Sequence, residues 1–599
     1  METKPFITKS KAPGLTLLLF LATFFLTSCT EKSRDGRVVF KEFYDCIVEE
    51  APSTYGKASP SRNDVSIRTL GFRPERDVFK AIEDFYATRL DWVYLNEDDR
   101  ENVLRVKGMG VRMGGAAAAG FHRGFNNNLL PGEEENELAF RRSLAIVDLE
   151  GNPIVASWKR TMAGVAWEAD PTNPAYFEAH LAFLKDLVDI GCESIQRDEP
   201  DMGTLAAERF GGGFSPSGIA SFREWMMKNI SAEKIREMGI QNIGNFDYKQ
   251  YLLEKGAPAG DAFRYFDCPV KETWVQFWDE YTKDFWQRIL AEIKQYANEK
   301  NVDLQISCNN SSLQLWTEVV QNFDFAMSEL MAGSAWPGHL HNRARVARSY
   351  EKHQMFNAPK CNPEADYTDE ERTILTRKVI ATSYSLGMTC QVPWDKWNHS
   401  NTRYFGKPDD YADLYAFIRA NDWSGYIEAA AVGPEIEQRS DKLEQLLSFE
   451  EGNGYVYGFL NLHKEDAQQP LLLFLIDWGK PLAERPPIEE MSFLEEGAYG
   501  KRLYFSPMGL ENLKRTDPEP FEIHFTANAF PVQADRLVFT LLEPQPYDQS
   551  LHKPSSEVSN YSVFVKTSEL TPKQDENGNF RLNIPRLSPW GVVQISLQE

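Results

Sequence analysis

Hydrophobic and polar positions between residues 64 and 425 follow two periods, one typical of strands and one typical of helices. Short apolar runs rich in β-branched and aromatic residues predict eight strands. These runs lie at residues 66–72, 90–95, 110–116, 193–199, 303–309, 323–329, 353–359 and 388–394. Helical patterns separate several of them, so we expect an α/β fold of the (β/α)8 or TIM-barrel type, with an open doubly wound sheet as the alternative.

Three of the connecting helices have clear signals. One follows Pro174 with apolar residues at steps of three and four until Gly191, which suits a helix C-terminus. A second begins at Ser215, where the next residue, a proline, fits the first helical turn. A third covers 271–300 and carries a stripe of Trp, Tyr, Phe and Ile.

Three predicted strands carry polar residues at every second position, which places those residues on one face. They are Ser194, Gln196 and Asp198, then Gln305, Ser307 and Asn309, then Thr389 and Gln391. Parallel strands buried on both faces are normally apolar throughout. We therefore expect the polar face to line a hydrogen-bonded barrel interior that leads to the mouth.

The pattern changes near residue 430. Strand-like runs recur there between turns rich in Pro, Gly and Asn, with almost no helical period. This texture is typical of a β-sandwich. The predicted organisation is a targeting segment at 1–29, an N-terminal segment at 30–63, the barrel at 64–429 and a C-terminal β-sandwich at 430–599.

The N-terminus resembles the signal peptide of a bacterial lipoprotein. Three lysines precede an apolar run from Leu15 to Leu26, which is too short to span a bilayer. The run ends in Leu-Thr-Ser-Cys, similar to a lipobox, in which the cysteine is lipidated after cleavage. The resemblance implies a lipid anchor on Cys29 and a place in the bacterial cell envelope, with an ordinary signal peptide as the alternative.

Charge and composition exclude several classes of partner and cofactor. The 599 residues carry a formal net charge of -23, so we expect no nucleic acid partner, and membrane contact only through the lipid anchor. No C-x-x-C pair occurs among the other cysteines, which favours buried thiols. His339 and His341 lack a third ligand at regular spacing, and the glycine-rich 108–115 lacks the spacing of a dinucleotide loop, so we expect no metal and no cofactor.

Candidate chemistry lies at the predicted strand ends, where a barrel of this kind places its functional side chains. Carboxylates from two strands, amides and Trp faces suit glycoside hydrolysis, which needs one carboxylic acid and a second carboxylate. The predicted catalytic residues are Glu199, Glu329 and Asp198. The predicted substrate-binding residues are Asn309, Asn310, Trp394, Asp395 and Trp397.

The tripeptide Asp198-Glu199-Pro200 is similar to the Asn-Glu-Pro that closes the fourth strand in clan A glycoside hydrolases. The resemblance implies Glu199 as the proton donor, with Asp198 at the place where an Asn usually binds a sugar hydroxyl. The stretch FSPSGIASFREWM and the β-rich C-terminus also resemble family 42-type β-galactosidases. Clan A places its nucleophilic Glu on strand seven, and the run at 353–359 has none, so Glu329 is the preferred second carboxylate.

A second resemblance leaves the roles open. A carboxylate pair on strands four and six is similar to clan D, whose members use Asp at the first position and often cleave α-linkages. This resemblance implies Asp198 as the nucleophile and Glu329 as the acid. If Glu329 lies on the far side of the barrel, or is bound by an arginine away from the mouth, Glu364 and Asp395 are the alternative candidates.

The predicted function is therefore an exported, lipid-anchored glycoside hydrolase that acts on a poly- or oligosaccharide. The alternative is a lipoprotein that binds glycans on a barrel scaffold without catalysis, which the missing carboxylate on strand seven favours. Hydrolysis of synthetic α- and β-glycosides distinguishes the two.

Substitution of Cys29 by alanine tests the anchor. We expect Cys29→Ala to be released from the membrane or to remain unprocessed, because the apolar run is too short to hold the chain in a bilayer. Cell fractionation and the intact mass of the mature protein measure this. Unchanged membrane association in the variant would contradict the lipobox interpretation.

Overall fold

In the computed structural model the described part of the chain runs from 60 to 598 with internal gaps. The gaps are 74–75, 96, 118–134, 156–166, 199, 201, 311–316, 332–334, 361–367, 398–402, 405, 435, 437–439, 450–454, 467, 481–491, 498–499, 506–514, 531 and 533. Within the described ranges no helix has both the length and the apolar character needed to cross a membrane. Cys29 lies outside them.

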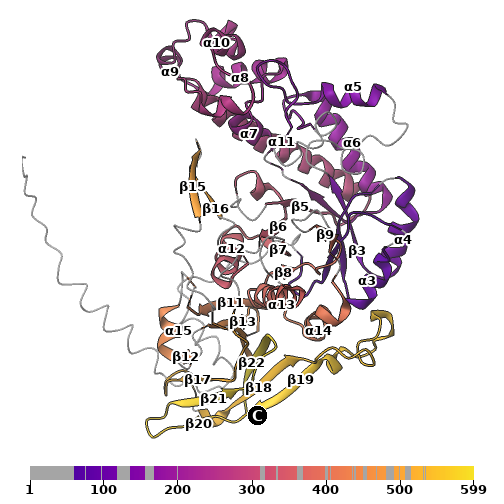
Figure 1. Ribbon diagram of the computed structural model, residues 1–599, viewed down its shortest axis with the longest axis vertical. Helices are drawn as coiled ribbons and strands as arrows, with labels where there is room; N and C mark the ends of the chain where they lie inside the picture. The colour runs from indigo at the N-terminus through magenta and orange to yellow at the C-terminus, as the bar shows by residue number, and fades with distance from the viewer. Residues whose placement is uncertain are drawn as a thin grey trace, which may run out of the picture.

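Eight parallel strands form one sheet in sequence order. They are β1 Ser66–Arg68, β2 Arg89–Val93, β3 Arg112–Ala117, β4 Ser194–Arg197, β5 Gln305–Asn309, β6 Phe325–Met331, β7 His353–Lys360 and β8 Thr389–Cys390. Just after β8 a parallel bridge joins Val392 to Ile67, and the Val392 amide donates to the Ser66 carbonyl at 2.8 Å. This contact brings the last strand back to the first, so the predicted (β/α)8 barrel and its eight strands are confirmed (Figure 1).

Helices surround the barrel in the intervals between the strands (Figure 1). They are α3 Val78–Asp84, α4 Arg100–Gly108, α6 Pro174–Ile190, α11 Lys271–Glu299, α12 Pro337–Ser349, α13 Asp369–Ser385 and, after β8, α14 Pro408–Ala420, while α5 Glu135–Ser143 lies higher, beside the helical insertion between β4 and β5 (Figure 1). The predicted helix after Pro174 is α6, which ends at Gly191 with a φ of 119°. A left-handed conformation of this kind favours glycine. The predicted helix at 271–300 is α11.

A helical insertion separates β4 from β5 and stands above the barrel in Figure 1. Its shorter helices are α7 Met202–Arg209, α8 Pro216–Asn229, α9 Ala232–Glu237 and α10 Tyr248–Glu254. Helix α8 begins as predicted, with the Ser215 hydroxyl accepting from the Gly218 amide. The insertion packs around its own aromatic core, in which Trp274 and Trp278 are fully buried.

Antiparallel sheets follow the barrel and confirm the expected β-sandwich. One sheet has the order β11-β13-β14-β22-β18-β19 and the other the order β12-β17-β21-β20. Their strands are β11 Tyr426–Val432, β12 Leu447–Phe449, β13 Val456–His463, β14 Leu471–Asp477, β17 Phe521–Phe525, β18 Leu537–Pro544, β19 Val565–Leu570, β20 Lys573–Gln574, β21 Phe580–Ile584 and β22 Trp590–Leu597. A helix, α15 Asp441–Leu446, and two ribbons, β9 Lys396–Trp397 with β10 Arg403–Tyr404 and β15 Ser492–Gly497 with β16 Gly500–Phe505, complete the chain.

The six-stranded sheet lies between the barrel and the four-stranded sheet. Apolar residues from both sheets, including Phe525, Phe539 and Phe580, form one core. On the other face of the six-stranded sheet, Trp590 packs edge-on against Phe417 of α14 at a centroid distance of 5.1 Å. The sandwich is thus attached to the barrel through a buried apolar surface.

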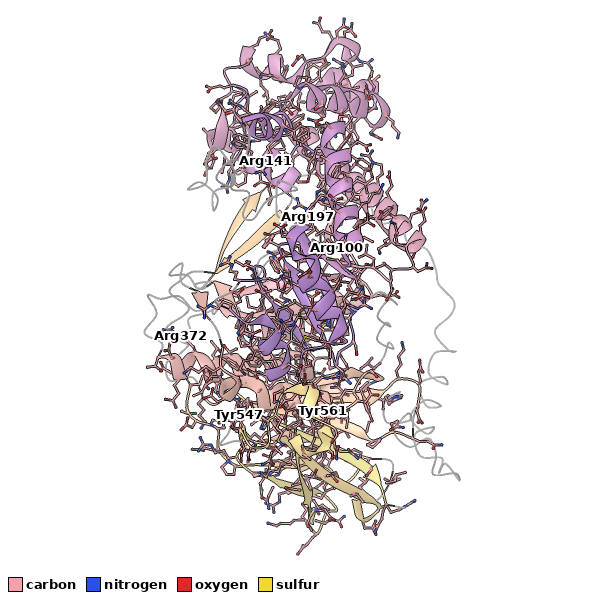
Figure 2. All side chains as sticks on the ribbon, turned by 90° about the vertical axis from the view of Figure 1, so that its right-hand side faces the viewer. Arg100, Arg141, Arg197, Arg372, Tyr547 and Tyr561 are labelled. Carbon is pink, nitrogen blue, oxygen red and sulfur yellow. The ribbon has the colours of Figure 1, made fainter. Side chains whose placement is uncertain are left out.

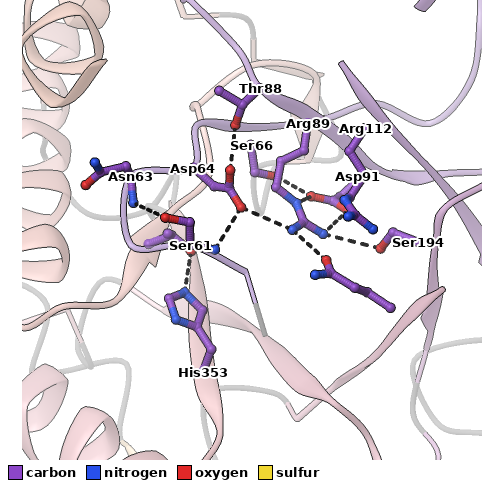
Figure 3. Close-up of polar contacts among 12 residues, drawn as sticks. Ser61, Asn63, Asp64, Ser66, Thr88, Arg89, Asp91, Arg112, Ser194 and His353 are labelled. Carbon is purple, nitrogen blue, oxygen red and sulfur yellow. Dashed lines mark hydrogen bonds and ion pairs between the residues drawn. The ribbon is translucent and has the colours of Figure 1, made fainter. Parts of the chain in front are cut away.

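The base of the barrel is polar, as the strand phases predict (Figure 3). Arg89 is 1% exposed, and its Nε donates to Asp91 Oδ2 at 2.6 Å. The same guanidinium donates to Gln305 Oε1 at 2.9 Å and to Ser194 Oγ at 3.3 Å. Ser66 Oγ donates to Asp91 Oδ2 at 2.8 Å. One buried ion pair therefore links four strands of the barrel.

Replacing Arg89 by methionine tests this link. We expect Arg89→Met to lower the free energy of unfolding by about 3–5 kcal/mol, because Asp91 is left as a buried charge without its counter-ion. Adding Asp91→Asn should recover part of the loss. The control is Arg112→Met, whose 3.1 Å ion pair with Asp303 lies near the surface, with side chains 30% and 79% exposed, and which should cost about 1 kcal/mol or less. Equal losses for Arg89→Met and Arg112→Met in denaturant titrations would contradict the role of Arg89.

Candidate active site

The end of β4 places Asp198 on the inward face of the barrel. Its backbone amide donates to the Ala117 carbonyl at the end of β3, at 3.0 Å. Asn309, the last residue of β5, donates its side-chain amide to Asp198 Oδ1 at 2.9 Å. A hydrogen bond to a carboxylate favours the charged form. Asn309 therefore orients Asp198 and stabilises its negative charge.

The segment after β4 is held from the outside of the barrel. Arg197 alternates with Asp198 and faces outward, where its guanidinium lies over the ring of Trp286 at 5.1 Å. The indole nitrogen of Trp286, on α11, donates to the Pro200 carbonyl at 2.6 Å. Figure 2 shows Arg197 between the barrel and the helical insertion. Helix α11 thus holds the backbone on both sides of Asp198, at Arg197 and at Pro200.

Glu329 lies on β6 in the same phase as the inward residues Phe325 and Met327. Its Oε1 accepts a hydrogen bond from Nη1 of Arg68, at the end of β1, at 2.8 Å. The side chains are 21% and 9% exposed, so the ion pair is shielded but reachable from solvent. The guanidinium stabilises the carboxylate form of Glu329. This arginine is on the barrel strand β1 rather than on a helix, so Glu329 stays the predicted second carboxylate, with Glu364 and Asp395 as the alternatives.

A bulge in β2 brings two aromatic residues to this ion pair. The pairing of β2 with β3 shifts between Leu90 and Val93, and Trp92 has a positive φ of 59°. As a result Trp92 joins the cluster inside the barrel, and the Arg68 guanidinium stacks on its ring at 3.8 Å. Such cation–π contacts hold an arginine side chain in place. The Trp92 indole then donates to the Tyr94 hydroxyl at 3.0 Å.

The negative charges of both candidate carboxylates affect the pKa of the Tyr94 hydroxyl. Burial raises the pKa of this hydroxyl well above the ordinary value, and the negative charges of Asp198 and, more weakly, Glu329 raise it further. The hydrogen bond from Trp92 and the charge of Arg68 lower it, each by less than Asp198 raises it and by more than Glu329 does. The contacts of Glu329 with Arg68, of Arg68 with Trp92 and of Trp92 with Tyr94 connect the carboxylate on β6 with this phenol.

The remaining predicted residues divide into buried supports and positions outside the described residues. Asn310 is fully buried and exchanges hydrogen bonds with Gln354, at 2.9 and 3.3 Å. Asp395 is 2% exposed and accepts from the Thr69 hydroxyl at 2.6 Å and the Leu70 amide at 2.9 Å, so it ties the end of the barrel to the loop after β1. Trp394 is 8% exposed and packs in the main core. Glu199, Glu364 and the side chain of Trp397 lie outside the described residues.

Sequence reasoning missed Arg68, Trp92 and Tyr94. Arg68 lies two positions after Ser66, so strand alternation places both side chains on the inward face and could have predicted Arg68 as a site residue. Trp92 and Tyr94 had no comparable signal, because simple alternation places Trp92 on the outer face and only the bulge reverses it.

The described residues contain no group of three or more His, Cys, Asp or Glu side chains arranged to hold a metal ion. His341 lies instead 3.6 Å from Glu428 of β11, between the barrel and the sandwich. The four cysteines in the described part of the chain are buried free thiols, as predicted. They are Cys192, Cys268, Cys308 and Cys390.

Comparison with known proteins gives two sequence relatives, and no family model matches the chain. The α-agarase of Thalassotalea agarivorans is 25% identical over 333 residues, which is 51% of this chain and 22% of the relative. The α-agarase of Alteromonas agarilytica is 26% identical over 329 residues, with the same two coverages. The chain thus matches less than a quarter of the length of either relative.

Solved structures with a related arrangement include three carbohydrate-active enzymes. A Paenibacillus sp. cycloisomaltooligosaccharide glucanotransferase has a TM-score of 0.42 and 9% identity, covering 89% of this chain and 85% of that one. The β-galactosidase of Marinomonas ef1 has a TM-score of 0.41, 9% identity and coverages of 60% and 60%. The α-amylase of H. orenii has a TM-score of 0.39, 11% identity and coverages of 91% and 100%. Likeness at this level carries no inference about activity.

Titration of Tyr94 tests whether the two carboxylates share this site. We expect its phenol to stay protonated well above pH 10, since burial and the nearby negative charges disfavour the phenolate. Removing a charge by Asp198→Asn should lower the pKa of Tyr94, and Glu329→Gln should lower it less. NMR of protein labelled at the tyrosine Cζ, with Tyr94→Phe to assign the signal, measures both shifts. A pKa of Tyr94 that neither substitution moves would contradict the geometry.

Proposed function

We propose that this protein is a glycoside hydrolase that cleaves an agarose-type polysaccharide at the mouth of its barrel. The observation that carries the proposal is the placement of two carboxylates at barrel strands, Asp198 after β4 with a hydrogen bond from Asn309, and Glu329 on β6 with an ion pair to Arg68. Two carboxyl groups at one site are the requirement of glycoside hydrolysis. The similarity to two α-agarases supports the substrate class.

The contacts at the mouth suggest how the roles divide. Arg68 stabilises the carboxylate of Glu329, which suits a nucleophile or a general base. Asn309 likewise stabilises the carboxylate of Asp198, which suits a group that binds a sugar hydroxyl. The proton donor is then Glu199, the neighbour of Asp198 in the sequence. This division agrees with the resemblance of the tripeptide to clan A.

A second division of roles rests on the α-linkage in the relatives' name. In that scheme Asp198 attacks the sugar, and Glu329 donates the proton to the leaving oxygen. The acid must hold its proton at the working pH, so Arg68 would have to move away from Glu329 when substrate binds. The ion pair therefore favours the first division, and the effect of Asp198→Asn decides between them.

We also propose that the protein is exported and anchored through a lipid on Cys29. The lysines and the apolar run that precede Cys29 support this. An anchored enzyme would act on polysaccharide at the cell envelope without contact between its acidic body and an anionic membrane surface.

Substitution of the carboxylates tests the hydrolytic proposal. The wild type should release reducing ends from agarose, and Glu329→Gln and Glu199→Gln should each lower kcat by about 10²- to 10⁴-fold while leaving thermal unfolding unchanged. In the first division of roles, Asp198→Asn has a mild effect. In the second it abolishes activity.

Glu193→Gln is the matched control. Glu193 precedes β4 at the opposite end of the same strand, and its side chain lies 3.5 Å from Lys107. This substitution should leave kcat unchanged. A wild type that binds agarose oligosaccharides without cleaving agarose or synthetic α- and β-glycosides would replace hydrolysis with the glycan-binding alternative.

A further inference from the structure

A cavity lies between the barrel and the sandwich, and none of the predicted site residues lines it. Its volume is about 320 Å³, within the range of about 300–1,000 Å³ usual for small-molecule sites. Three segments form its walls: residues 370–378 of α13, residues 515–518 before β17 and residues 586–589 before β22, with Trp478 beside them.

Four cationic residues line this cavity, of which Arg377 is paired with Asp413 at 2.6 Å and Arg586 lies 3.7 Å from Asp517. The other two are Lys378 and Arg515. Lys378 is only 4% exposed, and its ammonium group donates to the Trp478 carbonyl at 2.7 Å. The Arg515 guanidinium lies over the rings of Tyr455 and Trp478, at 5.3 and 5.4 Å, and donates to the Gly479 carbonyl at 3.2 Å. Both side chains are thus held in defined positions by the sandwich.

The electrostatics of the cavity favour an anion. Burial and, after it, the charge of Arg515 lower the pKa of Lys378, while Asp477 and Asp517 raise it, and the pKa lies at about 8 as a result. The ammonium group is therefore mostly protonated at neutral pH but carries a desolvation cost. An anion between Lys378 and Arg515 would offset that cost and relieve the repulsion between the two cations.

The acidic residues of the cavity are engaged elsewhere or lie at its rim. Glu371 closes the N-terminus of α13, where it accepts from the Thr368 amide at 2.7 Å. Asp517 lies 3.7 Å from Arg586, and Glu370 is exposed. We therefore expect the inner wall of the cavity to carry the positive charges of Lys378 and Arg515.

The rest of the lining suits a sugar ring more than a bare ion. Apolar groups surround the two cations, and two hydroxyl side chains lie among them. The apolar residues are Ile374, Leu375, Pro518, Leu587 and Pro589, and the hydroxyl residues are Thr516 and Ser588. Carbon-rich walls with a few polar groups are typical of sites that bind a small organic ligand.

We propose that this cavity binds an acidic sugar, with Lys378 and Arg515 contacting its sulfate or carboxylate group. Charge-assisted hydrogen bonds of this kind are stronger than neutral ones, and a guanidinium matches a planar or tetrahedral oxyanion well. The proposal does not depend on hydrolysis at the barrel mouth. It adds a second carbohydrate contact on a protein whose net charge of -23 otherwise repels acidic glycans.

Isothermal titration of the mature protein tests the proposal with four probes: galactose 6-sulfate, galacturonate, neutral galactose and sodium sulfate. We expect saturable binding of one or both acidic sugars, weaker binding of sulfate and none of neutral galactose at this site. Lys378→Met and Arg515→Gln should each weaken the acidic sugar about tenfold or more, since each removes a charge-assisted contact. Lys228→Met, an exposed lysine on α8, is the matched control and should change nothing.

Two further variants test whether binding depends on the charge of Lys378 and whether it is separate from the barrel mouth. We expect the wild type to lose affinity as the pH rises through about 8, because Lys378 then loses its charge. Lys378→Arg retains a positive charge, so it should preserve binding and remove this pH dependence. Glu329→Gln should leave this binding unchanged, which separates the cavity from the mouth. Equal affinity for sulfate and acidic sugars, or binding that survives both Lys378→Met and Arg515→Gln, would overturn the proposal.

Discussion

Closure of the barrel between β8 and β1 is the constraint on which the rest of the structure depends. The contact is small: a parallel bridge, a hydrogen bond from the Val392 amide to Ser66, and side-chain hydrogen bonds of Gln391 and Asp395. It nevertheless turns an ordered row of strands into a ring, so that the carboxyl ends of all strands surround one opening. Without it, Arg68 on β1 and Glu329 on β6 would lie far apart in the sheet order, and their ion pair could not form.

The interior of this ring is layered, and each layer has its own chemistry. Arg89 and Asp91 form the polar base, where a buried ion pair links several strands. Above them Trp92, Met327 and Met355 form an apolar layer. This layer separates the base from the charged groups at the mouth. The ion pair of Arg89 with Asp91 therefore stabilises the fold, and that of Arg68 with Glu329 belongs to the candidate site.

The fold was predictable because its signals are periodic. The strand runs, the helix after Pro174 and the change of texture near residue 430 all follow from repeated spacing along the chain. Even so, β11 begins at Tyr426, before the expected boundary at residue 430. It pairs with β13, and the local sequence pattern does not predict this pairing.

The site was only partly predictable from the same sequence. Asp198, Asn309 and Glu329 stand at strand ends, where topology places functional groups. Arg68 required knowledge of which strands face one another across the mouth, and Trp92 required the bulge in β2. Asn310 and Asp395 were predicted to bind substrate, but both are buried and hydrogen-bonded within the barrel. A polar residue at a strand end can bind substrate or support the fold, and only its burial and hydrogen bonds distinguish these two roles.

The central claim is that carboxylates from β4 and β6 act together on a sugar at the barrel mouth. The most direct measurement is a crystal structure of Glu329→Gln soaked with an agarose oligosaccharide. Our account predicts sugar rings across the mouth, with a glycosidic oxygen between residue 329 and the Asp198-Glu199 pair and with Tyr94 beside the cleaved unit. An oligosaccharide bound elsewhere, with the mouth left to solvent, would contradict it.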